Sequence, residues 1–312
     1  MEQTRTEQAS LTSVLEIVRR VPGWHDADPV ITPLPGGITN RNYRVETDGG
    51  AFVVRLPGER TELLGIDRAG EAAASYLAAD LGIAPAVRAE LPGVDTLVTE
   101  FVGGVPATTE ALLEPGVLEQ VTAMVRQFHG SGPIAATFPI FRVVEWHARD
   151  AAANGVEPPA VYDELHEAAS AIEAVFDPRS LESTLCHNDL LPANVLLTPR
   201  RLWIIDYEYA GMNHAVFDLA NLSVNCDFDA AADRRLLEAY DGDVSTRRLA
   251  ELALMKVMSE MREGMWAVVQ QAISTLTHVD FGDYAATRLE HCRELCADER
   301  FATWLEETRR DA

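Results

Sequence analysis

Short runs of hydrophobic and β-branched residues alternate with glycine-rich turns in the first hundred positions of the chain. These runs predict strands at residues 30–34, 42–46, 51–56 and 96–101. The segment Asp48-Gly49-Gly50, between two of them, is typical of a hairpin turn. A helix is expected to begin after Asp67, a residue type favoured at the N-cap, and to end before Gly82.

Helical periodicity dominates the rest of the chain. It predicts helices at residues 110–129, 161–176, 230–240, 249–276 and 284–308. The exception is the stretch 185–210, which reads as two apolar strands around a turn at 198–201. Gly103-Gly104 indicates a hinge between the two halves. We therefore expect an α+β protein with a small β-rich N-terminal lobe, residues 1–102, and a larger, mostly helical C-terminal lobe, residues 103–312.

Composition and charge narrow the choice of partner. The 312 residues are 47% hydrophobic, which is enough for a sizeable core. They include 26 basic and 49 acidic residues, a formal charge of −23, so we expect no nucleic-acid partner, because phosphate backbones bind basic surfaces. Negative clefts concentrate cationic ligands, although solubility alone also explains the charge. Charges within the first twenty positions, and the lack of a long apolar run, predict a cytoplasmic protein without a membrane partner. The oligomeric state stays open.

The candidate chemistry lies in the stretch from His187 to Asp206. If residues 194–197 pair with residues 202–206 across the turn, Asn194 comes next to Ile205 or Asp206, and the loop that carries Asp189 enters the same end of the hairpin. A carboxylate and an amide oxygen suit Mg²⁺, which takes its remaining ligands from phosphates and water. A second carboxylate nearby could accept a proton from an attacking hydroxyl. Each residue alone could equally cap a turn or end a strand, but the combination indicates phosphoryl transfer.

These motifs resemble the choline/ethanolamine kinase branch of the aminoglycoside phosphotransferase and choline kinase superfamily. The resemblance is carried by the sequences His187-Asn188-Asp189 with Asn194, Gly36-Gly37-Ile38-Thr39-Asn40-Arg41-Asn42-Tyr43, Asp206-Tyr207-Glu208-Tyr209-Ala210-Gly211, Phe217-Asp218-Leu219-Ala220-Asn221 and Trp266-Ala267-Val268-Val269-Gln270-Gln271-Ala272-Ile273-Ser274. It implies a bilobal, protein-kinase-like fold and an ATP- and Mg²⁺-dependent kinase. In such an enzyme Asp189 is the catalytic base and His187 braces the catalytic loop. Asn194 and Asp206 would hold Mg²⁺ against the ATP phosphates.

The N-terminal lobe supplies candidate ATP-binding residues. Arg55 lies in the third predicted strand, where it is either an edge residue or a phosphate ligand, and Glu71 on the following helix is its expected partner. Backbone amides near Thr39 and Asn40 could donate to phosphates if the loop at Gly36-Gly37 covers them, although two glycines before a strand also make a plain turn. Backbone groups of two further residues, Glu100 and Val102, would face adenine.

The predicted acceptor is a small amino alcohol, choline or an ethanolamine-like relative. Trp266 matches a tryptophan of the family's ammonium-binding cage, although it could equally be a packing residue. Glu263 replaces an aromatic residue of that cage, which favours an ammonium that can donate hydrogen bonds. Asn225 stands where the family tends to have an acid, and Glu208 completes the candidate acceptor-binding residues. The alternatives are a kinase of aminoglycosides or other small molecules, and a nucleotide-binding pseudokinase.

Overall fold

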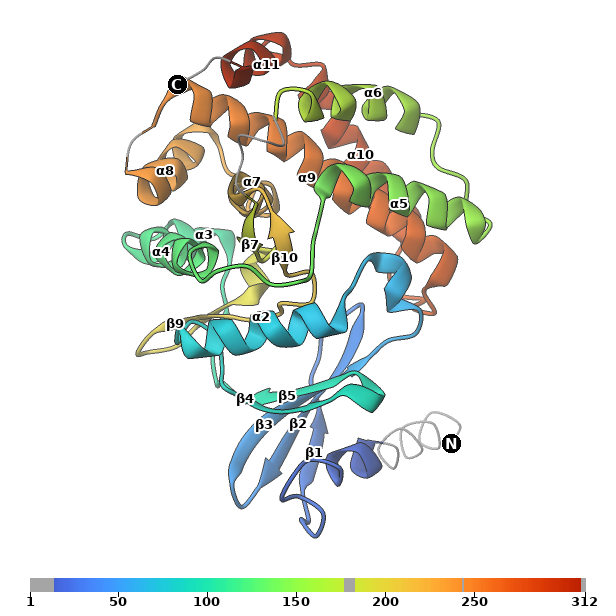
Figure 1. Ribbon diagram of the computed structural model, residues 1–312, viewed down its shortest axis with the longest axis vertical. Coiled ribbons are helices and arrows are strands. Elements are labelled where there is room, and N and C mark those ends of the chain that lie inside the picture. The colour runs from blue at the N-terminus through green and yellow to red at the C-terminus, as the bar shows by residue number, and fades with distance from the viewer. Residues whose placement is uncertain (1–13, 177–182, 243, 310–312) are drawn as a thin grey trace.

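The computed structural model describes residues 14–176, 183–242 and 244–309, and it consists of a small β-rich lobe and a larger helical lobe (Figure 1). The predicted α+β fold is thereby confirmed. Three of the six charged residues in the first twenty positions, Glu2, Arg5 and Glu7, lie outside the described ranges. None of the described helices combines the length and the apolar character that a membrane crossing requires.

An antiparallel sheet forms the N-terminal lobe. Its strands lie in the order β1 (Val30–Pro33), β2 (Asn40–Thr47), β3 (Gly50–Pro57), β5 (Thr96–Glu100) and β4 (Val87–Leu91). Thr47 pairs with Gly50, which confirms the predicted hairpin between β2 and β3. Alternate residues of these strands, such as Val45 and Val54, are fully buried in a core that they share with Val14 and Val18 near the N-terminus. Strand β4 was missing from the prediction.

Helix α2 (Arg68–Asp80) lies between the sheet and the helical lobe (Figure 1). The Asp67 side chain accepts hydrogen bonds from the Ala69 and Gly70 amides, which confirms it as the N-cap. Buried alanines of α2, together with a short 3₁₀ helix (Thr61–Leu64), belong to the core of the larger lobe rather than to that of the sheet. Helix α2 is therefore packed firmly against the C-terminal lobe.

The C-terminal lobe is built around one long helix, α9 (Thr246–Ile273), most of whose residues are buried. The helices around it are α3 (Thr109–Leu113), α4 (Val117–His129), α5 (Ile140–Ala153), α6 (Tyr162–Glu173), α7 (Ala215–Asn225), α8 (Ala230–Asp241), α10 (Phe281–Cys296) and α11 (Phe301–Arg309). Helices α7, α5 and α10 pack directly on α9. Helix α9 is therefore the centre of this lobe.

Two predicted helices are wrong in their extent. The segment 110–129 is divided into α3 and α4 by Pro115 and Gly116, and the latter has a φ of 83°, outside the helical region. The segment 284–308 is divided into α10 and α11 by a turn in which the Asp298 side chain accepts from the Arg300 amide. Helices α5 and α7 were not predicted, although the apolar residues Val144, Ala148 and Ala151 follow helical spacing.

Short strands connect the lobes and frame the predicted catalytic segment. Strand β8 (Val195–Leu197) pairs with β9 (Leu202–Ile204) and with β6 (Val105–Pro106), which follows the predicted hinge. Leu197 lies opposite Leu202, and the Ile205 amide donates to the Asn194 carbonyl, so the predicted register is confirmed. A separate pair, β7 (Thr184–Cys186) and β10 (Gly211–Asn213), flanks the same segment. Of these strands, β6 and β8 line the cleft between the lobes through Pro106 and Leu196.

Candidate active site

The loop at residues 187–194 joins β7 to a short 3₁₀ helix (Pro192–Asn194) and is anchored by buried polar contacts. The two carboxylate oxygens of Asp218, on α7, accept the His187 and Asn188 amides, each at 2.7 Å. Asn188 has a φ of 63°, a conformation that asparagine tolerates, and its side-chain amide donates to the Tyr209 carbonyl at 2.9 Å. The loop is thereby held in one conformation by two neighbouring elements.

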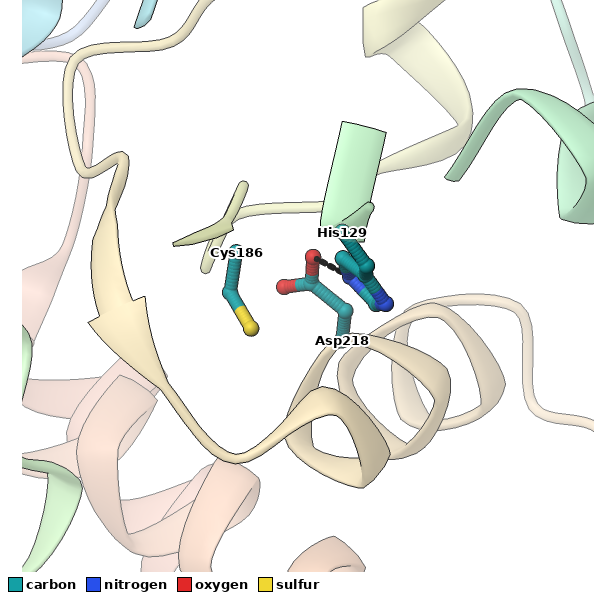
Figure 2. Close-up of side chains that lie close together, drawn as sticks. All are labelled: His129, Cys186 and Asp218. Atoms are coloured by element: carbon teal, nitrogen blue, oxygen red, sulfur yellow. Dashed lines mark hydrogen bonds and ion pairs between the residues drawn. The ribbon is translucent and has the colours of Figure 1, made fainter. Parts of the chain in front are cut away.

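His129, Cys186 and Asp218 form a buried cluster behind this loop (Figure 2). Their ligand atoms lie within 4.8 Å of one another, so the cluster has the composition of a metal site. However, both Asp218 oxygens already accept N–H groups, because His129 Nε2 donates to Oδ2 at 2.9 Å in addition to the two loop amides. Burial also raises the pKa of the Cys186 thiol well above its usual value, which keeps it protonated. The cluster therefore supports the catalytic loop and is not arranged to bind a cation.

His187 is buried under the loop, and its side chain is fully engaged. Its Nε2 donates to the Ile205 carbonyl at 3.0 Å, and its Nδ1 accepts the Asp189 amide at 3.3 Å. Burial lowers the pKa of His187, so the ring stays neutral and can keep both contacts. These contacts are those of a residue that braces the loop, which is the role that the sequence predicted.

Asp189 lies at the turn of the loop, where one of its oxygens is occupied. Arg262 Nη1, from α9, donates to Asp189 Oδ1 at 3.1 Å. Burial raises the pKa of Asp189 to about 7; the positive charge of Arg262 opposes this shift, whereas the negative charges of Glu263 and Asp206 add to it. A carboxyl group with a pKa near neutrality is suited to accept and release a proton.

Asn194 and Asp206 belong to the same end of the hairpin, because the Ile205 amide donates to the Asn194 carbonyl and Asp206 is the next residue. The Asn194 side-chain nitrogen donates to the Asp189 carbonyl at 2.9 Å, so its Oδ1 is the end left to face a cation. Asp206 has a φ of 71° and lines the cleft. The two residues offer only oxygen donors, which fits Mg²⁺ and disfavours softer metals.

Arg55 connects two other predicted residues, Glu71 and Asp206. Its Nη1 contacts Glu71 Oε1 at 2.7 Å, which confirms the expected partner, and its Nη2 lies 2.6 Å from Asp206 Oδ1. Glu71 also receives Arg68 Nη1 at 2.7 Å. The contact with Asp206 was not predicted, and it links β3 to the candidate metal site across the cleft.

A cavity of about 410 Å³ opens between the lobes beside these charges. Its walls include Arg55, Glu71, Glu100, Val102 and Asp206, together with apolar residues from both lobes. The Glu100 amide donates to the Ala86 carbonyl, so the carbonyl of Glu100 is the group that it can offer to a ligand. A cavity with an apolar end and a charged end has the character of a nucleotide site.

The side chain of Asn40 is used within the protein. Its Nδ2 donates to Glu208 Oε2 at 2.6 Å, and its Oδ1 accepts from Arg68 at 3.0 Å. Burial raises the pKa of Glu208 to about 8, and the neighbouring Asp206 carboxylate adds to the shift. Thr39 is tied to β3 through its carbonyl, which accepts the Gly58 amide. The structure therefore places Glu208 with the loop of the N-terminal lobe and gives it no contact with the other candidate acceptor residues.

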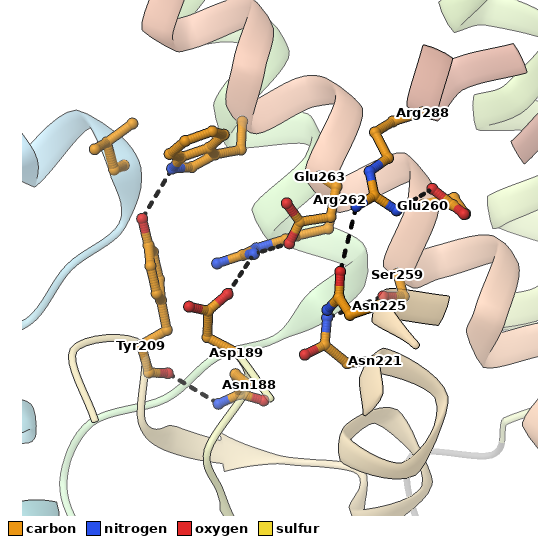
Figure 3. A network of polar contacts seen from close by, with 12 residues as sticks. Asn188, Asp189, Tyr209, Asn221, Asn225, Ser259, Glu260, Arg262, Glu263 and Arg288 are labelled. Carbon is orange, nitrogen blue, oxygen red and sulfur yellow. Dashed lines mark hydrogen bonds and ion pairs between the residues drawn. The ribbon is translucent and has the colours of Figure 1, made fainter. Parts of the chain in front are cut away.

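A second group of aromatic and charged residues, from α9, α10 and the segment after Asp206, surrounds Asp189 (Figure 3). Trp266 Nε1 donates to the Tyr209 hydroxyl at 2.9 Å, and its ring lies edge-on to Phe281 and Tyr284. Glu263 accepts from the Tyr284 hydroxyl at 3.0 Å and is also paired with Arg262. Trp266 and Glu263 are thus brought to one place, as the sequence predicted.

Asn225 is placed differently from Trp266 and Glu263. It lies at the end of α7, where Arg288 donates to its Oδ1 at 3.4 Å, and Arg288 also pairs with Glu260 (Figure 3). Sequence reasoning also missed Arg262, Asp218, Tyr209 and Tyr284 as site residues. A charged residue in an otherwise apolar helix was a usable signal for Asp218, which is the single charged residue of α7.

A two-lobed fold with an interlobe cavity, a carboxylate on the loop between β7 and β8, and two oxygen-bearing side chains, Asn194 and Asp206, at the end of the hairpin is the arrangement expected of a kinase-type phosphotransferase. The chain belongs to the phosphotransferase enzyme family (APH), whose model matches residues 30–252. The chain is thus a phosphotransferase, and the proteins to which it is similar include choline/ethanolamine kinases, in agreement with the resemblance found in the sequence.

Three known proteins illustrate this relationship. Protein LicA of Haemophilus influenzae is 29% identical over 273 residues, which cover 82% of this chain and 76% of LicA. Mouse ethanolamine kinase 2 is 27% identical over 312 aligned positions, covering 89% and 79% of the two chains. The crystal structure of a choline/ethanolamine kinase family protein from Mesorhizobium loti is 28% identical, covers 96% of this chain and 99% of the other, and superposes with a TM-score of 0.81.

Proposed function

We propose that this phosphotransferase transfers the terminal phosphoryl group of ATP, with Mg²⁺, to the hydroxyl of a small amino alcohol such as choline or ethanolamine. ATP occupies the interlobe cavity, with adenine near the backbone of Glu100 and Val102 and the phosphates near Arg55. Besides the contacts with Glu71 and Asp206, the guanidinium of Arg55 carries further N–H groups, which are suited to phosphate oxygens. Backbone amides near Thr39 and Asn40 are further candidate donors to the phosphates.

Asp189 is the catalytic base in this proposal. As the acceptor oxygen bonds to the γ-phosphorus and the bond to ADP breaks, the hydroxyl proton passes to the Asp189 carboxylate. Its raised pKa supports this role, because a base with a pKa near the working pH can both take up and release the proton.

Asn194 and Asp206 hold Mg²⁺ in this proposal. Asn194 is oriented by its bond to the Asp189 carbonyl, and Asp206 faces the cavity. The bound ion supplies neutralisation of the phosphate charge. The ion pair between Arg55 and Asp206 keeps this carboxylate directed into the cleft.

The observation that carries the choice of acceptor is the charge balance beside Asp189. Two carboxylates, Asp189 and Glu263, share a single buried cation, Arg262, so this side of the site has a net negative charge. A monocationic acceptor balances it, and the faces of the Tyr284 and Trp266 rings attract an ammonium group. An aminoglycoside would bring several positive charges to a place that balances one.

A coupled assay of ADP release tests the proposal. The panel contains choline, ethanolamine, their N-methyl intermediates, an aminoglycoside and a neutral sugar, each with Mg²⁺ and ATP. We expect turnover with one or more of the amino alcohols, and a loss of about 10²–10⁴-fold in kcat for Asp189→Asn with ATP binding retained. The matched control is Glu238→Gln, which removes an exposed carboxylate on α8 and should leave kcat unchanged. Turnover with only the aminoglycoside or the sugar would falsify the acceptor assignment.

A further inference from the structure

Arg262 is the one feature of the active site that neither the catalytic motif nor the metal ligands explain. It lies in the middle of α9, 73 positions along the chain from Asp189, and its side chain is only 2% exposed. The catalytic loop itself, residues 187–194, contains no lysine or arginine. The positive charge beside the base therefore comes from a distant helix.

Its contacts hold the guanidinium in one place. Nη1 reaches both Asp189 Oδ1 and Glu263 Oε1. The centre of the group lies 4.3 Å from the ring centroid of Tyr209 and 5.8 Å from that of Phe138, and cation–π attraction favours both approaches. Nε and Nη2 have no hydrogen-bond partner among the residues that the structure describes. A buried arginine is costly, and this one is stabilised mainly by the two carboxylates.

The contact makes the two oxygens of Asp189 unequal. Oδ1 accepts from Arg262, whereas the other oxygen points to the side of Tyr209, away from the guanidinium (Figure 3). The base is thereby held with one oxygen occupied and one directed toward the aromatic side of the site, where the proposed acceptor would bind. A carboxylate without this contact could rotate about its side-chain bonds and would reach the productive orientation for only part of the time.

We propose that Arg262 is a positioning residue for Asp189, and that Glu263 keeps Arg262 in the position where it holds Oδ1. This inference rests on the proposed function only in taking Asp189 as the base. It does not depend on which hydroxyl compound is the acceptor. The competing explanation is that Arg262 and Glu263 form a purely structural ion pair, and the two explanations differ in what happens when both charges are removed.

The test compares Arg262→Met, the double variant with Glu263→Gln, and the wild type. Arg262→Met leaves the buried Glu263 charge without a cationic partner, so we expect a lower Tm and a fall in kcat of about 10²-fold, with the KM for ATP unchanged. The double variant removes that unpaired charge, so its Tm should recover toward the wild type, while its kcat should stay as low as that of the single variant. Recovery of kcat together with Tm would overturn the inference, because it would show that only stability had been lost.

Lys256→Met is the matched control. Lys256 lies on the same helix and pairs with Asp233 at 2.9 Å, in a partly buried contact on α8. Its loss should lower Tm without lowering kcat, and a matching loss of kcat would count against a specific role for Arg262. All variants are assayed with the acceptor that the wild type turns over fastest. Should the wild type phosphorylate no amino alcohol, the proposed function fails, and the same comparison is made on its hydrolysis of ATP by water.

Discussion

Arg55 on β3 and Asp206 on the opposite lobe form an ion pair across the cleft, with 2.6 Å between Nη2 and Oδ1. The other nitrogen of the same guanidinium contacts Glu71 on α2. One planar group therefore joins the sheet, helix α2 and the candidate metal ligand. This arrangement requires the planar guanidinium of arginine, which presents N–H groups on two separate nitrogens. The single ammonium nitrogen of lysine cannot do this.

Replacing Arg55 is therefore expected to affect the handling of ATP more than that of the acceptor. Arg55→Met should raise the KM for ATP about tenfold or more and should leave the KM for the acceptor within about twofold, because the acceptor side is built from other residues. Arg55→Lys should restore only part of the loss, because one ammonium cannot serve both carboxylates. Steady-state kinetics with each substrate varied in turn checks this. An equal rise in both KM values would contradict the assignment of Arg55 to the nucleotide.

The pH dependence of kcat should follow the protonation of Asp189. Its pKa is raised to about 7, chiefly by burial. The base works only when deprotonated, so kcat should be constant above this pH and should fall about tenfold for each unit below it. The measurement is kcat from about pH 5.5 to about pH 9 at saturating substrates, with the KM for ATP determined at each pH to separate the ionisation of the nucleotide. A kcat that stays constant down to the acid end of this range would show that Asp189 is not the titrating base.

Asn40 and Glu208 should act as a unit that holds the nucleotide loop against the other lobe. Each is at most 6% exposed, and the hydrogen bond between them joins β2 to the segment after Asp206. Asn40→Ala and Glu208→Ala should each raise the KM for ATP several-fold, and the double variant should be little worse than the poorer single one. The expected coupling is about 0.5–3 kcal/mol in a double-mutant cycle. Additive effects would mean that the two side chains act separately.

The sequence was sufficient to predict the local parts of this site. The hairpin at β8 and β9, the approach of Asn194 to Ile205, and the N-cap at Asp67 all depend on residues near one another in the chain, where turn chemistry and strand pairing set the geometry. The partnership of Arg55 with Glu71 could also be predicted, because a strand followed by one helix leaves few arrangements.

Contacts between distant segments could not be predicted in the same way. Asp218 supports the loop at residues 187–194 from α7, and Arg262 reaches Asp189 from α9. The apolar surroundings of Asp218 indicate that it is buried, but the sequence around either residue does not show which distant segment it contacts. The contact of Glu208 could not be predicted from the local sequence either. Its position after Asp206 was visible, but its direction, toward Asn40, depends on how the two lobes meet.

The tight contact of α2 with the larger lobe leads to a last prediction. A Cβ atom placed on Gly70 would lie only 2.4 Å from the Cβ of Ala136, so an alanine cannot fit unless one of the two segments moves. Gly70→Ala should lower the free energy of unfolding by about 1–3 kcal/mol, although alanine is the better helix former.

The displacement should also reach the active site, because Glu71 is the next residue and holds Arg55. We therefore expect the KM for ATP to rise in Gly70→Ala, while the KM for the acceptor changes little. Gly130→Ala is the matched control. Gly130 has a φ of −84°, its nearest contact is 3.6 Å, and alanine there should be neutral or slightly stabilising. Thermal unfolding and ATP kinetics on both variants check the prediction. A Gly70→Ala protein as stable as the wild type would show that α2 can move relative to the larger lobe without cost. The fixed position that we infer for Glu71 would then be wrong.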